Sequence, residues 1–584
     1  MSPATRTLLL ALLLLAASGA SALRLAPAAP PLDARALAAA CPDAACRVVV
    51  AREKADAVKA ELDAVPRGQA GVEAVAAVAL REGGFPAASG AVAAASPSLE
   101  AAILRLYDGI GLPVDDALRA RVHEQTAAMT PAWRDAITPL VDAATASALA
   151  SARIVSPSDR ATLLANPALT AMLVSLAGTA PAQGLPPAAA AQWAADRAAL
   201  ARVDRAAISA AAMPLAHAVS HFQAPATTAS CDRMLDLPFI VIGGACDDTY
   251  TDTYVLQVDQ GGSDTYLDNA GGAAALPALA LDLGAGDDTY RAYGVAQGAA
   301  LASAGILYDA GGSDLYNVSQ FGQGSGNVGF GMLDDAGAGN DIYESPSGPI
   351  ATDLSTSVGS IATKASAVGG AGILVDEGGD DRYQQDGLDG FIYGGAEGIG
   401  LMLERGGDDT YTANETSISL LGSDLGVFAG PIEISAEADG TAILDEEGGH
   451  DSYFMGPHVR QGGQGAAGVG ALTLLLEQGG DDAYTLGPEV EPGNVAGIGQ
   501  LATGQGAAYG LATPPGPALA ILDDRAGDDA YTAAQWAQGY GGASVGVLLD
   551  EGGQDRHQAP APTLGSRADG ATWVDGAAGV GVDI

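Results

Sequence analysis

Apolar and polar positions follow a fixed order along the second half of the chain. Apolar runs, for example at 306–308 and 373–375, are each followed by an acid, a Gly-rich turn, a second Asp and a Tyr. The consensus is acid-x-G-G-x-D-x-Y. Short apolar runs bounded by Gly-rich clusters are typical of buried strands joined by tight turns. We therefore expect an apolar strand, an acidic turn and a strand that carries the Tyr.

This pattern recurs at short intervals. The second Asp of each copy stands at positions 248, 264, 288, 314, 341, 381, 409, 451, 482, 529 and 555. A period near 26 residues is too short for a propeller blade of about 40–45 residues and indicates stacked repeats. We predict a parallel β-solenoid, a β-helix or β-roll, over residues 231–557, with its Tyr rings stacked in a ladder and a C-terminal cap or tail at 558–584.

The first half has a different pattern. Residues 23–230 are rich in Ala, Leu and Val with helical periodicity, and they predict an all-α domain. Helices are expected to start at Ser98, after Pro97, and at Pro157, after Ser156. The fold class is therefore α + β, multidomain. The helical domain is either a partner-binding unit or a cap on the exposed edge of the solenoid.

The charge separates the two halves sharply. The net charge is −43. Residues 1–240 contain 20 acidic and 19 basic residues, whereas residues 241–584 contain 50 acidic and 8 basic ones. Such a surface excludes binding to nucleic acid or to anionic lipid, whose phosphates repel it. The explanation of the charge must therefore lie in the repeats.

The N-terminus is typical of a secretory signal peptide, which we place at residues 1–22. Arg6 precedes an apolar run at 8–15, and Ala20-Ser21-Ala22 provides small residues for cleavage. The alternative is an uncleaved anchor, although the apolar run is short for about 30 Å of hydrocarbon. No later segment predicts a membrane span, so an extracellular or cell-surface location is expected.

The four cysteines fit an exported protein. Cys41, Cys46, Cys231 and Cys246 are even in number, which favours disulfides over free thiols. Cys41–Cys46 and Cys231–Cys246 are the simplest of the three possible connectivities. The spacing does not choose among them.

Stacked acidic turns create an electrostatic problem. Carboxylates in neighbouring turns would lie about 4.8 Å apart and repel each other. A divalent cation removes the repulsion, and Ca²⁺ prefers the carboxylate and carbonyl oxygens that Asp and Gly-rich turns supply. The alternative is a solvated acidic coat, which explains the charge but not its fixed place beside Gly-Gly and before Tyr.

The turns also resemble a known family. Gly284-Ala285-Gly286-Asp287-Asp288-Thr289-Tyr290 and the corresponding stretch ending at Tyr343 are similar to the hemolysin-type (RTX) calcium-binding repeat, G-x-G-x-D-x-U. The resemblance is limited to the turns of residues 241–557. It implies a parallel β-roll with Ca²⁺ held between adjacent turns. The implied ligands are Asp259, Asp264, Asp282, Asp288, Asp309, Asp314, Asp335, Asp341, Asp376, Asp381, Glu404, Asp409, Asp445, Asp451, Glu477, Asp482, Asp524, Asp529, Asp550 and Asp555.

Two further groups of residues could carry chemistry. His217 and His221 stand four apart on one predicted helix face, a spacing that can hold a metal, but no third ligand is evident nearby. In the repeats, basic residues that could act beside carboxylates are sparse. They are Arg382, Arg405, His450, His458 and Arg460.

These observations lead to one functional hypothesis and one alternative. We expect a secreted calcium-binding repeat protein with a structural, adhesive or cell-surface role, whose partners beyond calcium are surface polysaccharide or protein. The alternative is an extracellular β-helix enzyme that acts on polysaccharide. The sequence contains no recognisable nucleophile–base set, which favours the first hypothesis.

Overall fold

The computed structural model of the 584-residue chain describes most of residues 44–584. The segments outside the description are 1–43, 89–94, 166–186, 227–229, 268, 346–359, 362–363, 389–391, 396, 415–433, 437–439, 456–463, 468–470, 487–504, 509–517, 534–537, 542–543, 559–569 and 575–578. The expected signal peptide and Cys41 therefore lie outside the described residues. Residues Leu32–Ile584 belong to one compact unit.

The N-terminal region is helical. Its elements are α3 (Ala44–Leu62), the 3₁₀ helix η1 (Gly68–Gly71), α4 (Val72–Glu82), α5 (Leu99–Gly109), α6 (Asp116–Ala128), α7 (Pro131–Ile154), α8 (Pro157–Ala165), α10 (Pro187–Leu200) and α11 (Arg205–His221). Both predicted starts are confirmed, because the Ser98 side chain caps α5 by accepting from Ala101 N–H, and α8 begins at Pro157. Among the described residues, none of the helices has the length and apolar character needed to cross a membrane.

The rest of the chain forms a stack of strands, most of them parallel. The largest sheet has 14 strands in the order β1 (Leu235–Leu237), β2 (Ile240–Ile242), β4 (Leu256–Asp259), β7 (Ala278–Asp282), β10 (Ala304–Asp309), β13 (Phe330–Asp335), β17 (Ala371–Asp376), β20 (Ile399–Glu404), β23 (Thr441–Glu446), β26 (Leu472–Glu477), β29 (Leu519–Asp524), β31 (Val545–Asp550), β34 (Val580–Asp583) and β33 (Thr572–Trp573). Only the first and last pairs in this order, β1–β2 and β33–β34, are antiparallel.

A second long sheet carries the tyrosines. Its strands are β3 (Thr249–Tyr250), β5 (Thr265–Tyr266), β8 (Thr289–Gly294), β11 (Leu315–Gln320), β14 (Ile342–Ser345), β18 (Arg382–Leu388), β21 (Thr410–Asn414), β24 (Ser452–Met455), β27 (Ala483–Leu486), β30 (Ala530–Thr532) and β32 (Arg556–Gln558), with β15 (Ser360–Ile361) beside β11 and β18. Two smaller sheets contain β6 (Ala273–Ala274), β9 (Ala300–Leu301) and β12 (Gly326–Asn327), and β16 (Ala367–Val368), β19 (Ile392–Gly395), β22 (Ile434–Ala436), β25 (Ala466–Ala467) and β28 (Ala507–Ala508). This architecture is compatible with the predicted solenoid.

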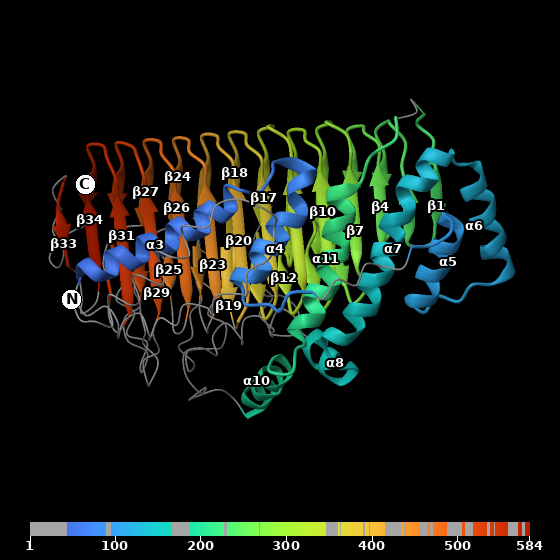
Figure 1. Cartoon of the computed structure of the whole chain (residues 1–584), viewed down its shortest axis with the longest axis horizontal. Helices are drawn as coiled ribbons and strands as arrows, with labels where there is room; N and C mark the ends of the chain where they lie inside the picture. Colours follow the sequence, from blue (N-terminus) through green and yellow to red (C-terminus); the bar gives the residue numbers. More distant parts are fainter. Residues whose placement is uncertain are drawn as a thin grey trace, which may run out of the picture. The chain divides into compact units, whose positions relative to one another are not determined.

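Most strands of the 14-stranded sheet, such as β10 and β17, are buried on both faces, which explains their unbroken apolar runs. In β10, Leu307 packs in one core cluster with the tyrosines, whereas its neighbour Ile306 packs in another with residues of the helices. The helices α3, α4 and α11 lie against the face of the sheet that carries Ile306, opposite the tyrosines (Figure 1). The helical region therefore covers the strands and shares their core.

Charged groups also join the helices to the sheet. The Arg405 side chain is only 3% exposed, and its Nη2 donates to the carbonyl of Val65, just before η1. Its guanidinium lies 3.7 Å from Glu377 and 3.8 Å from Glu447. Two carboxylates and a carbonyl thus surround one buried cation at this contact.

The predicted tyrosine ladder is confirmed. The parallel register pairs each Tyr of the second sheet with the Tyr of the next repeat, as in Tyr316 with Tyr343. Ring centroids along the row from Tyr250 to Tyr531 are 4.4–5.1 Å apart, and His557 continues the row 4.6 Å beyond Tyr531. Each stacked pair adds about 0.5–1.5 kcal/mol beyond area burial. The ladder thereby fixes the register of the repeats.

The disulfide prediction is borne out for one pair. Cys231 and Cys246 are bonded to each other, which joins the segment before β1 to the first acidic turn. The second predicted disulfide, Cys41–Cys46, includes Cys41, which lies outside the residues that the structure describes.

Candidate metal centre

The first group of acids stands at the ends of strands in the 14-stranded sheet and points inward. We call these the strand-end acids: Asp259, Asp282, Asp309, Asp335, Asp376, Glu404, Glu446, Glu477, Asp524, Asp550 and Asp583. Strand register aligns them, for example Asp309 with Asp335 and Asp335 with Asp376. All are at most 3% exposed. The parallel pairing that stacks the repeats therefore also stacks buried carboxyl groups.

Two sequence assignments change with the register. Glu446 pairs with Glu404 and Glu477, whereas the predicted ligand Asp445 pairs with Leu403 and lies one position outside the row. Asp445 instead accepts a hydrogen bond from Gln478 at 3.1 Å. A spacing rule could have found Glu446, because most strand-end acids precede their turn Asp by five residues, as Glu404 precedes Asp409.

The last strand-end acid, Asp583, was also missed. It pairs with Asp550 and lies 3.1 Å from His557, which holds the ladder position of a Tyr. No acid-x-G-G turn follows Asp583 in the sequence, so the repeat pattern gave no signal for it.

Strand-end acids are held by the ladder and by the turn backbone. The Tyr316 hydroxyl lies 3.0 Å from Asp309 Oδ2 and 2.9 Å from Asp335 Oδ2. In most of these carboxyls the other oxygen accepts from a turn N–H, as Asp309 Oδ1 accepts from Gly311 at 3.0 Å, whereas Glu446 Oε1, Asp524 Oδ1 and Asp550 Oδ1 have no hydrogen-bond partner in the structure. Both oxygens of Asp309 therefore have protein partners.

The second group, the turn acids, leaves one oxygen without a partner. These residues are Asp264, Asp288, Asp314, Asp341, Asp381, Asp409, Asp451, Asp482, Asp529 and Asp555. Each Oδ1 accepts the backbone N–H of the turn acid one repeat earlier, as Asp341 Oδ1 accepts from Asp314 at 2.5 Å. Each Oδ2 is buried with no hydrogen-bond partner in the structure. A buried carboxyl oxygen in this state requires either a proton or a cation.

The two groups converge in clusters that bridge repeats. Ligand oxygens of Asp259, Asp264 and Asp282 lie within 4.8 Å of one another, and so do those of Asp282, Asp288 and Asp309. Similar groups recur, among them Asp314 with Asp335 and Asp341. Apart from Asp445, the predicted ligands all belong to these two rows.

Burial sets the protonation of these acids in the absence of a cation. Desolvation raises the pKa of Asp381 to about 10, and the charge of Asp376 adds to the shift. It raises the pKa of Asp288 to about 10 and that of Asp314 to about 9, with neighbouring carboxylates contributing in both cases. Without a counter-ion, these turn acids would therefore keep their protons at neutral pH.

A third row of polar residues in the turns is exposed, and its side chains accept hydrogen bonds from the backbone of the next repeat. We call it the outer row: Asp247, Ser263, Asp287, Ser313, Asn340, Asp380, Asp408, His450, Asp481 and Asp528. Each side chain accepts the N–H of the corresponding residue in the next repeat, as Asp380 accepts from Asp408 at 3.0 Å. Ser, Asn and His serve as well as Asp, so this position requires an acceptor and not a charge.

Glycine makes room for these rows. A Cβ on Gly339 would lie 1.4 Å from the carbonyl oxygen of Gly312 in the preceding repeat. Real Cβ atoms never approach so closely. The turn backbones therefore stack in contact, which brings the acids of successive turns together.

Other candidates are placed differently. His217 and His221 share one face of α11, and the structure adds Glu73 of α4 beside them. His458 and Arg460 lie outside the described residues. Arg405 is engaged with the helices as described above, and His450 belongs to the outer row. The structure thus does not bring these basic candidates together among the residues it describes.

Comparisons with known proteins add no constraint on function. No family model, curated protein or solved structure matches this chain.

Proposed function

We propose that this chain is an exported calcium-binding repeat protein with a structural or adhesive role at the cell surface. The observation that carries the proposal is the row of buried turn-acid oxygens that lack a partner, one in each of ten successive turns. Ca²⁺ between the strand-end acid and the turn acid would supply that partner, turn after turn.

The electrostatics favour a cation over a bare carboxylate row. Two charges about 4.8 Å apart repel by about 3 kcal/mol at an effective dielectric of about 20. Each turn contributes two such acids, and each faces its counterpart in the next repeat. A bound divalent ion offsets this repulsion while the acids stay ionised, whereas protons remove it only by neutralising the carboxylates.

The ligand chemistry favours calcium among divalent ions. The turn clusters named above offer carboxylate oxygens without imidazole or thiolate, whereas the last one, Asp550 with Asp583, includes His557. Hard oxygen ligands in flexible number suit Ca²⁺, which takes six to eight of them. The similarity of the turns to RTX repeats agrees with this choice. Export would bring the chain to a medium where calcium is plentiful, and binding would complete the fold there.

In this proposal the sheets are the faces of one parallel β-solenoid, and its outer row lies exposed to solvent along the turns. Surface polysaccharide or protein is the partner class we propose. The ions would act by rigidifying the repeats, so that a long and regular surface persists outside the cell.

A calcium titration tests the proposal. The mature chain, treated with EDTA, would be titrated with CaCl₂ while far-UV circular dichroism and melting temperature are followed, with Mg²⁺ and NaCl as controls. We expect Ca²⁺ alone to raise the melting temperature cooperatively. Equal stability in EDTA, or an equal gain with NaCl, would show that protons or bulk salt satisfy the turns and would refute the proposal.

A matched pair of variants locates the effect. Asp381→Asn with Asp409→Asn removes two partnerless oxygens, while the amide carbonyl can still accept the N–H of the preceding repeat. Asp380→Asn with Asp408→Asn makes the same change of charge in the outer row. The calcium-induced gain should shrink in the first double variant and stay unchanged in the second.

A further inference from the structure

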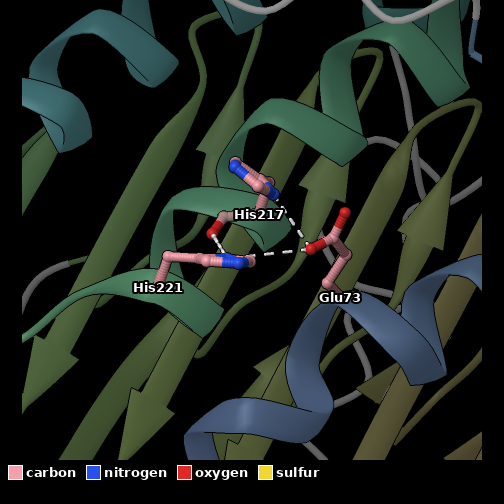
Figure 2. Close-up of side chains that lie close together, drawn as sticks. All are labelled: Glu73, His217 and His221. Atoms are coloured by element: carbon pink, nitrogen blue, oxygen red, sulfur yellow. Dashed lines mark hydrogen bonds and ion pairs between the residues drawn. The ribbon is translucent and has the colours of Figure 1, made fainter.

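Three side chains from distant parts of the chain converge on the outer face of the helical region. Glu73 lies in the first turn of α4, and His217 and His221 lie in the last two turns of α11. His217 Nδ1 is 2.9 Å from Glu73 Oε2, and His221 Nδ1 is 3.8 Å from the same oxygen (Figure 2). The two imidazole rings are 4.1 Å apart between centroids. One carboxylate oxygen thus faces a nitrogen of each ring.

The backbone around this cluster is held rigidly. The Glu73 N–H donates to Ser220 Oγ at 2.7 Å, which ties the start of α4 to the end of α11. Gln69 of η1 donates to the carbonyls of Val219 and Phe222 at 2.6 and 2.7 Å, and so caps the C-terminus of α11. The relative position of the two helix segments that carry the three side chains is therefore fixed before any ligand binds, which favours an effective metal site.

The setting also favours a cation. The histidines stand near the C-terminal end of α11, where the helix dipole places partial negative charge. The side chains of Glu73, His217 and His221 are 37%, 53% and 63% exposed, so an ion and its water ligands have access from solvent. His221 Nδ1 also lies 3.0 Å from the backbone carbonyl of His217 (Figure 2), so a metal ion would have to replace this contact as well as the contacts to Glu73.

We infer that Glu73, His217 and His221 form a binding site for a borderline transition-metal ion, with Zn²⁺ as the representative. Two imidazoles and one carboxylate are a ligand set that Zn²⁺ accepts, with the fourth position left to water. The site is chemically unlike the acidic turns, whose oxygen ligands suit Ca²⁺. An ion here would clip α4 to α11 across 144 residues of sequence. This inference does not depend on the calcium proposal.

The test is a metal titration of the full mature chain in excess CaCl₂. The excess Ca²⁺ keeps the titrated metal away from sites that offer only oxygen ligands. Co²⁺ absorption in the visible range reports nitrogen ligands, and Zn²⁺ is then titrated in competition. The variants are His221→Gln, His217→Gln and Glu73→Gln, all at exposed side chains. His123→Gln is the matched control, because His123 is exposed and contacts Glu100 at 2.9 Å without a second His.

We expect the wild-type chain and the His123→Gln variant to bind one equivalent of metal that the His221→Gln variant lacks. Each of the three site substitutions should weaken binding at least about tenfold. Circular dichroism without metal should be the same for all chains. If the wild-type chain and the His221→Gln variant titrate alike, or the wild-type chain gives no Co²⁺ band, the site does not exist and the cluster is only a pair of ionic contacts.

Discussion

The Tyr316→Phe substitution isolates the contribution of one ladder hydroxyl. The Phe ring keeps the stacking on Tyr290 and Tyr343, each 4.8 Å away between centroids. Only the hydroxyl between Asp309 and Asp335 is lost, and both carboxyls are fully buried. Leaving a buried hydrogen-bonding group without its partner costs about 1–3 kcal/mol, so we expect a local loss of about 2 kcal/mol.

Hydrogen exchange measures this loss where it occurs. Stacked repeats need not unfold in one step, so a global unfolding curve would blur a local effect. A loss of about 2 kcal/mol should speed the exchange of amides in β10 and β13 by about 30-fold. Tyr293→Phe is the control, because the Tyr293 side chain is largely exposed and its hydroxyl lies outside the ladder. An acceleration below about threefold in Tyr316→Phe, or one equal to the control, would refute the assigned role of the hydroxyl.

Three further predictions follow from the same geometry. Gly339→Ala should abolish soluble folded protein, because the new Cβ would lie 1.4 Å from the carbonyl oxygen of Gly312. Gly111→Ala is the control, because Gly111 has a positive φ but open space around it; this variant should lose about 1 kcal/mol of folding stability and still express. In EDTA, the free energy of unfolding should fall as pH rises from about 4 toward 10, because Asp288 keeps its proton up to about pH 10 when folded but loses it near pH 4 when unfolded. Melting temperatures measured at pH 5, 7 and 9 should show this decline. Saturating Ca²⁺ should make the melting temperature less dependent on pH. Arg405→Ala should destabilise the chain by about 3 kcal/mol in urea unfolding, because the buried Glu377 then keeps only the Gly68 N–H and the Arg67 guanidinium 4.0 Å away. Arg67→Ala, at a side chain that is 56% exposed, should cost at most about 1 kcal/mol.

The candidate centre was partly accessible from sequence. The turn acids, including Asp264 and Asp381, could be read directly, because each occupies the same place in a repeated phrase. Strand register then decides which neighbouring acid joins them. It selects Glu446 over Asp445, since side chains alternate between the faces of a strand and a shift of one residue moves a carboxyl to the other side.

The burial of these acids was not accessible from the pattern. An acid at the end of an apolar run was expected in a turn, yet Asp309 and its counterparts point into the core beneath the tyrosine ladder. Their depth depends on hydroxyl and backbone donors supplied by other repeats. The outer row shows the opposite case, because Asp380 and Ser313 hold equivalent positions and only the structure reveals their shared role as acceptors.

By itself, the sequence determined the repeat, the ladder and the separation into a helical part and an acidic part, because these depend on periodic and local patterns. Tertiary structure decided where the helices lie, which acids are buried and which distant residues meet. The apolar pair Ile306 and Leu307 could not reveal that one would face helices and the other tyrosines. The pair His217 and His221 likewise could not reveal Glu73, 144 residues from His217, because no local pattern records a contact made only by packing.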